Sequence, residues 1–296
     1  MSVLPIPGRQ PRRPNYRLRR IWVETGSVLL GIVIAFWSLV PVYNMLRIAF
    51  DPEGTNEFTG DLWPDDATFA AFRALITESV DDVQHFWTQF GNSAYIGFSV
   101  MVSTVLIGSL ASFAIGRMRL SKEWMLNDTA LLTYIIPTSA LVIPFFRVMH
   151  IYGLSDNPIS VIAAETAFVA PYAILVFLQY GKLIPIELDD AARIDGASPW
   201  QLYLLIYLPL MAPALAAIGT YALLFAWNDY LYQYMLLASE KHTTIAVALE
   251  NFFDDDDAPW NYMMAMSIIY SIPPIAIFYG LRRYIAAGLT LGGVKG

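Results

Sequence analysis

Six apolar stretches, each long enough to cross a membrane as a helix, constrain this chain more than any other feature. A helix needs about 20 mostly apolar residues to span the hydrocarbon core. The stretches are residues 21–49, 93–115, 126–148, 159–180, 202–226 and 262–285. With 56% hydrophobic and 15% charged residues among 296, the chain is too apolar for a soluble domain of this size. The predicted fold class is therefore all-α integral membrane, with six transmembrane helices.

The first stretch is predicted to be a retained transmembrane helix and not a cleaved signal peptide. Its apolar run is longer than that of a typical signal peptide, and residues 38–43 offer no clear cleavage site of small residues. Residues 1–20, which precede it, form an arginine-rich tail.

Lysine and arginine residues are distributed unevenly between the two sides of the predicted bundle. One side carries Arg9, Arg12, Arg13, Arg17, Arg19, Arg20, Arg117, Arg119, Lys122, Lys182, Arg193, Arg282, Arg283 and Lys295. The opposite side carries Arg73 and Lys241 in connections, and the long acidic segments 51–82 and 240–257. Because short connections rich in lysine and arginine stay in the cytoplasm, both termini are predicted to be cytoplasmic.

The polar connection between the fourth and fifth stretches, residues 181–201, is predicted to form two short helices joined by a sharp turn. We call this connection the elbow. Pro185 can start the first helix, and Gly196 can end it in a left-handed conformation. Acidic residues suit its opening turns: Glu187, Asp189 and Asp190. Ser198 can cap the second helix, with Pro199 in its first turn.

Small and polar residues share one face of the first short helix at spacings of three and four: Leu188, Ala191, Ala192 and Asp195. The alanine side chains would let this face approach the groove of a partner closely. An ordinary surface helix between spans is the alternative. The residues that follow the spacing E-A-A-x3-G-x9-I-x-L-P are Asp190, Ala191, Ala192, Gly196, Ile206, Leu208 and Pro209.

This spacing resembles the loop by which permease subunits of bacterial ABC importers bind their ATPase, with Asp190 where that family usually has Glu. Two further blocks are similar to maltose-type permeases of the carbohydrate-uptake branch. They are W-N-D-Y-L at 227–231 and the ending at 283–296, before which Arg282 replaces the usual Gln. The resemblance extends over about 92–296 and does not explain the N-terminal tail or the first external segment.

The resemblance implies the type I importer fold, with the first helix added to a five-helix permease core at 92–287, in the bacterial inner membrane. It also implies four kinds of partner: a homologous second permease in a heterodimer, two cytoplasmic ATPase subunits, an external solute-binding protein and membrane lipid. ATP and Mg would be bound by the ATPase subunits, with no cofactor on this chain. No nucleic acid partner is expected.

The resemblance places the contacts with the ATPase in the elbow and in the C-terminal tail, residues 288–296. The expected coupling-loop residues are Glu187, Asp190, Ala191, Ala192, Asp195, Gly196, Ile206, Leu208 and Pro209. In the tail, which we expect to be flexible, they are Gly293, Lys295 and Gly296. The implied mechanism is alternating access, driven by closure of the ATPase subunits.

Candidate residues of the solute path lie at the end of the fifth stretch. Trp227 offers an aromatic face to a sugar ring, and Asn228 and Asp229 can hydrogen-bond its hydroxyl groups. The alternative is that Trp227 anchors the helix at the membrane interface and Asn228 caps it. Glu165, inside the fourth stretch, would either line the path or pair with the second permease.

Two other classes of membrane protein fit this sequence less well. A secondary, ion-coupled transporter would show internal repeats and several ionisable groups at mid-membrane, whereas Glu165 alone lies deep and no repeat is evident. An enzyme would need a nucleophile or a metal cluster, yet the chain has no cysteine, and His85, His150 and His242 are far apart in sequence. With no phosphate-binding loop of the G-x4-G-K-[ST] type, ATP hydrolysis is expected on a separate chain.

Two external segments remain. Residues 50–91 contain apolar side chains of their own, which favours either a small helical cap or a solvated acidic loop. The segment 228–261 contains four aspartates at 254–257. It lacks the ligand spacing and turn glycine of an EF-hand, so a solvated turn is favoured over a calcium site.

Overall fold

The structure is a computed structural model that describes residues 16–52, 62–118, 133, 136–253 and 259–293. Over these residues all regular secondary structure is helical. Helices satisfy their backbone amides and carbonyls within one segment, as the hydrocarbon core requires. The α-helices are α1 Tyr16–Phe50, α2 Ala70–Thr77, α3 Phe86–Arg117, α5 Thr138–Ile151, α6 Pro158–Gly181, α7 Glu187–Ile194, α8 Pro199–Gln201, α9 Leu208–Leu210, α10 Ala212–Asn228, α11 Leu231–Leu236, α12 Ile245–Asn251 and α13 Trp260–Gly293. A 3-10 helix, η1 Asp81–Val83, precedes α3, and a π-helix, η2 Leu202–Tyr207, lies between α8 and α9.

Four of the described helices, α1, α3, α6 and α13, are long and apolar enough to cross a membrane. The number rises to five if the bent pair from α8 to α10 is one span. The third predicted span, 126–148, lies partly outside the described residues, and the described helix there is α5, which is 14 residues long. The count of six therefore stays a prediction.

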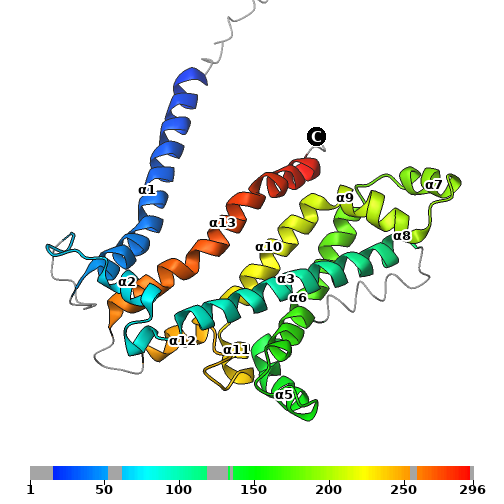
Figure 1. Ribbon diagram of the computed structural model, residues 1–296. Helices are drawn as coiled ribbons and strands as arrows, with labels where there is room; N and C mark the ends of the chain where they lie inside the picture. Colours follow the sequence, from blue (N-terminus) through cyan, green and yellow to red (C-terminus); the bar gives the residue numbers. More distant parts are fainter. Residues whose placement is uncertain (1–15, 53–61, 119–132, 134–135, 254–258, 294–296) are drawn as a thin grey trace, which may run out of the picture.

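Helix α3 is the centre of the molecule, where it packs along both α6 and α10, and α10 in turn packs on α13 (Figure 1). Helices α3 and α6 approach each other closely at Gly108. A Cβ atom there would lie 2.9 Å from the Cβ of Ala173 and 3.0 Å from the ring of Phe177. The absence of a side chain at Gly108 thus sets how closely these two helices can pack.

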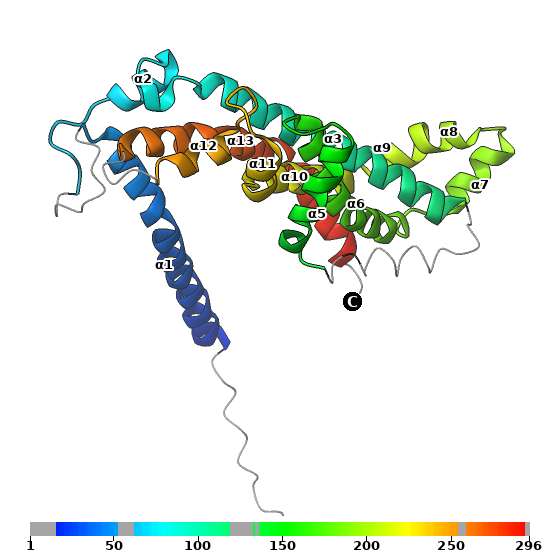
Figure 2. The ribbon, with the colours of Figure 1, turned by 90° about the horizontal axis from the view of Figure 1, so that it is seen from below.

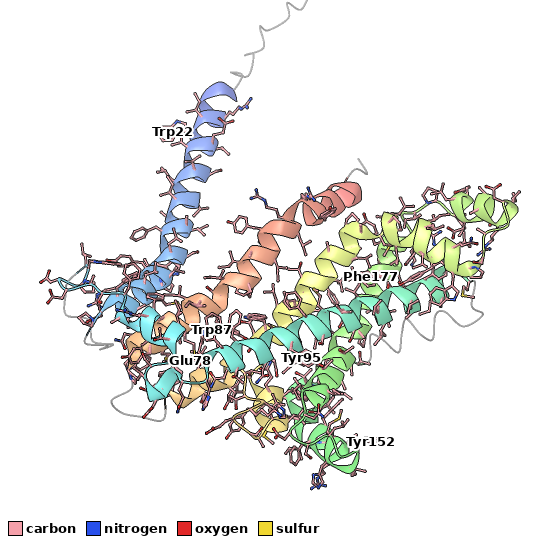
Figure 3. The ribbon with its side chains drawn as sticks, in the orientation of Figure 1. Trp22, Glu78, Trp87, Tyr95, Tyr152 and Phe177 are labelled. Carbon is pink, nitrogen blue, oxygen red and sulfur yellow. The ribbon has the colours of Figure 1, made fainter. Side chains whose placement is uncertain are left out.

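Helix α1 leaves the body of the molecule, as the two perpendicular views show (Figures 1 and 2). It contacts α13 and α2 at its C-terminal end, where Ile48 and Ala49 are buried. From Ile21 to Tyr43 its apolar side chains are exposed, including Trp37 at 81% and Trp22, which projects away from the other helices (Figure 3). The chain itself therefore covers almost none of its first span.

The start of α1, the end of α13 and the elbow helix α7 lie in the upper half of Figure 1, whereas α2, α12 and the end of α5 lie in its lower half. This is the grouping that the distribution of lysine and arginine predicts. Which side faces the cytoplasm stays a prediction.

The fifth span, predicted at 202–226, is bent. The helical segment Pro199–Leu210 meets Ala212–Asn228 at an angle of 78°. Pro209 and Pro213 each remove a backbone amide donor near the bend, which weakens the helix there. The prediction of a span at these residues did not include the bend.

The first external segment is helical where it is described. Helix α2 and η1 place Leu75, Val83 and the first residue of α3, Phe86, in a core cluster with side chains of α10 and α13. Of the two alternatives, the structure has the packed helical cap over residues 62–91. The aspartates at 254–257 lie outside the described residues.

The C-terminal tail also differs from the prediction. We expected a flexible segment at 288–296 after the last span, but α13 continues without interruption to Gly293. The glycines at 288 and 292 lower helix propensity without ending the helix, because a continuing helix needs only helical dihedral angles. Lys295 and Gly296 lie outside the described residues.

The close approach at Gly108 can be tested with a matched pair of substitutions. Gly108→Ala should destabilise the protein by about 1–3 kcal/mol, because the new methyl group overpacks the contact with Ala173. Gly116→Ala is the control, since its Cβ would meet only Leu178, at an ordinary 3.5 Å. Thermal unfolding in detergent should give a lower midpoint for the first variant alone, and equal midpoints would contradict the packing.

Candidate functional site

The elbow has the local structure that its sequence predicts. Gly196 adopts a φ of +83°, and the Ser198 side chain accepts a hydrogen bond from the Gln201 amide in a reciprocal capping box. Both predictions are confirmed. Helix α7 begins at Glu187, two residues after Pro185, so the proline precedes its first turn. Nothing lies within 4 Å of the position that a Cβ on Gly196 would take, so the constraint there comes from the backbone alone.

Helix α7 turns most of its surface outward. Leu188, Ala191 and Asp195 are exposed, and so is Ile194, at 86%. Ala192 is half-buried against the core below. An isoleucine this exposed on a short polar helix was not singled out from the sequence, because its position at the helix end gives no periodic signal.

Asp189 is the exception on α7, since its side chain is only 4% exposed. It pairs with Arg117, the last residue of α3, whose Nη1 lies 3.3 Å from the Asp189 Oδ2. The other terminal nitrogen of Arg117 donates to the carbonyls of Gly181 at 2.8 Å and Ile184 at 2.9 Å. One guanidinium thus holds the end of α3, the end of α6 and the start of the elbow together.

Two tyrosines of the π-helix extend this attachment along α3. The hydroxyl groups of Tyr203 and Ser109 are 2.8 Å apart, and those of Tyr207 and Ser112 are 3.1 Å apart. Phe113 packs against both tyrosine rings, at centroid distances of 5.3 and 5.2 Å. All four hydroxyl-bearing side chains are buried, so each pairing satisfies groups that would otherwise be unpaired away from water.

A pocket of about 620 Å³ opens beside this attachment. It lies between the ends of α3 and α6 and the start of the elbow, with Arg117, Lys182 and Glu187 among its charged lining residues. Over the described part of the chain, no group of three His, Cys, Asp or Glu residues could hold a metal ion.

The predicted elbow residues divide into two groups in the structure. Glu187, Asp190, Ala191, Asp195 and Gly196 are exposed on the elbow itself. Ile206 and Leu208 are half-buried in the core at the base of the elbow, and Pro209 stands at the start of α9, before the bend. The I-x-L-P part of the pattern therefore builds the base, and the first part forms the exposed surface.

The predicted path residues lie in or beside the core. Trp227 is 2% exposed, stacks on Tyr270 at 4.8 Å and donates from its indole nitrogen to the Tyr270 carbonyl. The ring therefore joins α10 to α13 in this conformation. Asp229 caps α11 by accepting bonds from the amides of Tyr232 and Gln233.

Asn228 and Glu165 complete that predicted set. Asn228 is exposed, and its amide group donates back to the Leu224 carbonyl. Glu165 is fully buried within the helices of this chain, beside Asp229 and Gln233. In this conformation Trp227 and Glu165 face no open path, and their assignment to the solute path stays a prediction.

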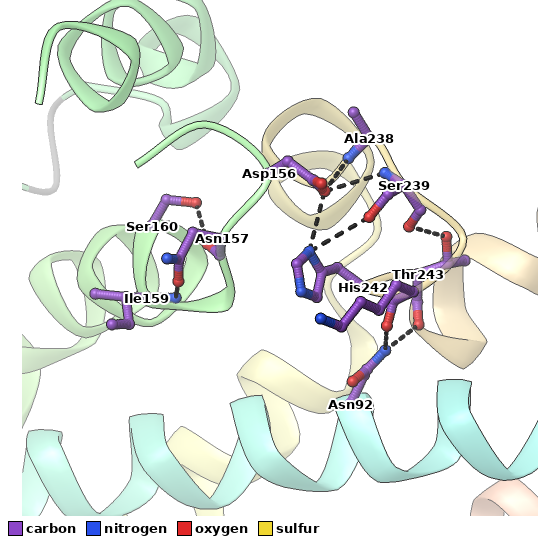
Figure 4. A network of polar contacts seen from close by, with 10 residues as sticks. Asn92, Asp156, Asn157, Ile159, Ser160, Ala238, Ser239, His242 and Thr243 are labelled. Atoms are coloured by element: carbon purple, nitrogen blue, oxygen red, sulfur yellow. Dashed lines mark hydrogen bonds and ion pairs between the residues drawn. The ribbon is translucent and has the colours of Figure 1, made fainter. Parts of the chain in front are cut away.

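Asp156 organises a polar network at the opposite end of the molecule (Figure 4). Its carboxylate accepts bonds from the amides of Ala238 and Ser239, at 2.9 and 3.0 Å, and lies 3.3 Å from Nδ1 of His242. Asn92 of α3 donates to the carbonyls on either side of His242. The connection between α11 and α12 is therefore tied both to the start of α6 and to α3.

The environment of Asp156 favours its ionised form. Burial by itself would raise the pKa of Asp156, but hydrogen bonds from Ala238, Ser239 and His242 lower it to about 2. Sequence analysis did not identify this network. Asp156 and Ala238 lie 82 residues apart in connections between helices, where no regular spacing of residues marks them.

Comparisons with known proteins place these features in context. The family model described as "Binding-protein-dependent transport system inner membrane component" matches residues 104–291. The chain is 32% identical to the arabinooligosaccharides transport system permease protein AraQ of Halalkalibacterium halodurans, over 89% of this chain and 93% of that protein. It is 31% identical to the trehalose transport system permease protein SugB of Mycobacterium tuberculosis, over 96% of this chain and 99% of that protein.

Two solved structures share the fold. One is a bacterial ABC transporter that imports the acidic polysaccharide alginate, with a TM-score of 0.75, 23% identity and coverage of 93% of this chain and all of the matched one. The other is a bacterial alginate ABC transporter in complex with a periplasmic protein that has bound an alginate pentasaccharide, with a TM-score of 0.66 and 17% identity, over 91% of this chain and 96% of that one. At these identities the likeness supports the fold.

The Asp156 network makes a prediction about pH. Because the pKa of Asp156 is depressed in the folded protein, its carboxylate stabilises the fold above the ordinary pKa near 3.8, and this stabilisation is lost as the pH falls toward 2. Asp156→Asn should therefore lower the unfolding temperature at pH 5, and the difference from wild type should shrink between about pH 4 and 2. Asp66→Asn, at an exposed aspartate, is the control. An equal loss at every pH would show that the charge of Asp156 does not stabilise the fold.

Proposed function

Because the chain belongs to the family of binding-protein-dependent transport system inner membrane components, we propose that it forms, with a second permease, the path of an ATP-driven importer. The proposed cargo is a sugar or sugar-like solute, delivered by an external binding protein. AraQ and SugB, whose names refer to arabinooligosaccharides and trehalose, are the relatives that support this cargo.

The exposed elbow is the single observation that best supports coupling to an ATPase. Its helix α7 presents an uncovered isoleucine, small alanine side chains and carboxylates, which is a surface suited to a groove in another protein. The elbow is held to α3 by buried hydrogen bonds from η2 and by the ion pair of Asp189 with Arg117. A displacement of α7 would therefore be transmitted to the spans. We assign to the ATPase contact the exposed residues of the predicted set, with ATP and Mg bound on separate chains.

The exposed first span supports the second permease. Helix α1 has apolar side chains around its circumference and departs from the helices of its own chain (Figure 3). Lipid alone could cover it, but a helix that leaves its own core is in a position to pack on a homologous subunit. On this basis we propose a heterodimer in which α1 contributes to the subunit interface.

The proposed orientation puts the elbow and both chain ends in the cytoplasm and the Asp156 network outside. The grouping of these segments on two sides of the structure supports it, together with the excess of lysine and arginine on the elbow side (Figure 1). The binding protein would then meet the side that carries α2, α12 and the end of α5.

Substitution of Gly196 tests the role of the elbow. Gly196→Val should disturb the turn, because a β-branched side chain is costly at a φ of +83°, whereas Gly196→Asn should be tolerated. We expect the valine variant to insert in the membrane and to lose both co-purification of the ATPase and uptake of the solute. Retention of the ATPase and full uptake by the valine variant would exclude the elbow as the coupling site.

Accessibility of introduced cysteines tests the orientation. The chain has no native cysteine, and Tyr152 and Asp195 are exposed at opposite ends of the molecule. A membrane-impermeant thiol reagent should label Tyr152→Cys in intact cells and leave Asp195→Cys and Ser2→Cys unlabelled until the cells are opened. The reverse pattern would place the elbow outside, away from ATP.

A further inference from the structure

We propose that Arg117 is a positioning residue that locks the elbow to α3, so that α3, α6 and α7 move as one body when the ATPase acts on the elbow. This inference rests on the proposed function, since it concerns how a displacement of α7 reaches the spans. It assigns a role to Arg117 and Asp189, neither of which belongs to the exposed elbow surface.

The geometry at Arg117 joins three separate segments through one side chain. The guanidinium bonds to Asp189 of α7, to the carbonyl of Gly181 at the end of α6 and to the carbonyl of Ile184 in the connection between them. Its carbon lies 5.8 Å from the centre of the Tyr207 ring. The attachment is reciprocal, because Arg193, near the end of α7, donates to the backbone carbonyl of Arg117 at 3.2 Å. Both ends of α7 are therefore fastened to the last residue of α3.

The chemistry requires arginine at this position. A planar guanidinium can donate in several fixed directions at once, whereas the ammonium of lysine is a compact point charge on a flexible stem. The side chain of Arg117 is 6% exposed, and a buried ion pair contributes little net stability compared with apolar side chains of similar volume. Stability alone thus does not account for a charged pair here, whereas a fixed geometry between elements does.

Two adjacent acidic residues of α7 have different environments and therefore different proposed roles. Asp189 points into the body and Asp190 is exposed, although they are adjacent in sequence. Asp190 is available to a partner protein, and Asp189 is fully engaged within the chain. Substitutions at these two positions should therefore have different consequences.

The flexible point of this assembly is predicted to lie beyond the base. The hydroxyl pairs from Tyr203 and Tyr207 hold η2 to α3, and the 78° break at Met211 follows immediately. Helix α10 starts after that break and packs on α13 and also on α3 and α6. The body formed by α3, α6 and α7 can therefore move relative to α10 only by sliding along these packed faces, with the bend at Met211 taking up the change in angle.

The test uses spin-label pairs in the complete, reconstituted importer. Leu188 is exposed on α7 and lies outside the residues assigned to the ATPase contact. Cysteines at Leu188 and Val102 report the distance from the elbow to α3, and cysteines at Leu188 and Tyr221 report the distance from the elbow to α10. Addition of ATP and vanadate should leave the first distance unchanged and alter the second. A change in the first distance in otherwise wild-type protein would overturn the proposal.

The double variant Arg117→Met, Asp189→Leu removes the clamp without leaving a buried unpaired charge, and the adjacent pocket lets water reach the freed carbonyls. We expect it to bind the ATPase, to broaden the distance distribution between Leu188 and Val102, and to lose about 10-fold in the stimulation of ATP hydrolysis by the binding protein. Lys182→Met, which removes an exposed cation of the same pocket, is the matched control.

The outcomes separate this inference from the proposed function. Wild-type distances and wild-type stimulation in the double variant would show that the clamp is structural only, and would overturn the positioning role. A double variant that fails to assemble, together with full stimulation in a separate Arg117→Lys variant, would also overturn the positioning role. A single positive charge at position 117 would then be sufficient, and the geometry of the guanidinium would not be needed. If Ile194→Asp on the exposed surface leaves the ATPase bound, the proposed function itself fails.

Discussion

The rule that hydrocarbon accepts no unpaired backbone group governs this structure. Long helices satisfy it directly, and the interesting positions are those where a helix is interrupted. Near Met211 the chain bends by 78°, and the residues before the bend form a π-helix whose tyrosines reach serines of α3. At and just after the end of α6, Arg117 donates to the carbonyls of Gly181 and Ile184. Polar side chains thus allow the backbone to turn at the place where the elbow must leave the membrane.

These interruptions also explain how the molecule combines rigidity with movement. Gly108 lets α3 and α6 pack at van der Waals contact, and the attachments at the base of the elbow extend this packing to α7. At the other end, Asp156 and Asn92 fasten the connection between α11 and α12 to α6 and α3. At the bend, the Leu215 amide donates to the Met211 carbonyl, and α10 packs on both α3 and α6. Movement at the bend therefore requires these packed helix faces to slide.

The sequence predicted the elements that local rules control. The glycine at 196 and the cap at Ser198 follow from backbone geometry, and the apolar runs follow from the thickness of the membrane. It did not predict the bond from Arg117 to Asp189 or the hydroxyl pairs, since residues 72 to 95 positions apart are brought together only by helix packing. The sequence signal for the hydroxyl pairs was the spacing of two tyrosines four residues apart and of two serines three residues apart, each on an apolar helix. Trp227 is a predicted residue of the path because its aromatic face suits a sugar ring, yet its packing on Tyr270 places it in the core of this conformation.

The core beneath the external helices has a consequence for the order in which the chain is completed. Leu75, Val83 and Phe86 are made early, whereas Met263, Met266 and Tyr270, which complete the same cluster, belong to the last helix. Asn261 likewise bonds to the carbonyl of Asp51, 210 residues before it. These contacts cannot form before residues 261–270 have been synthesised. The core beneath α2 and η1 therefore remains incomplete until this part of α13 has left the ribosome.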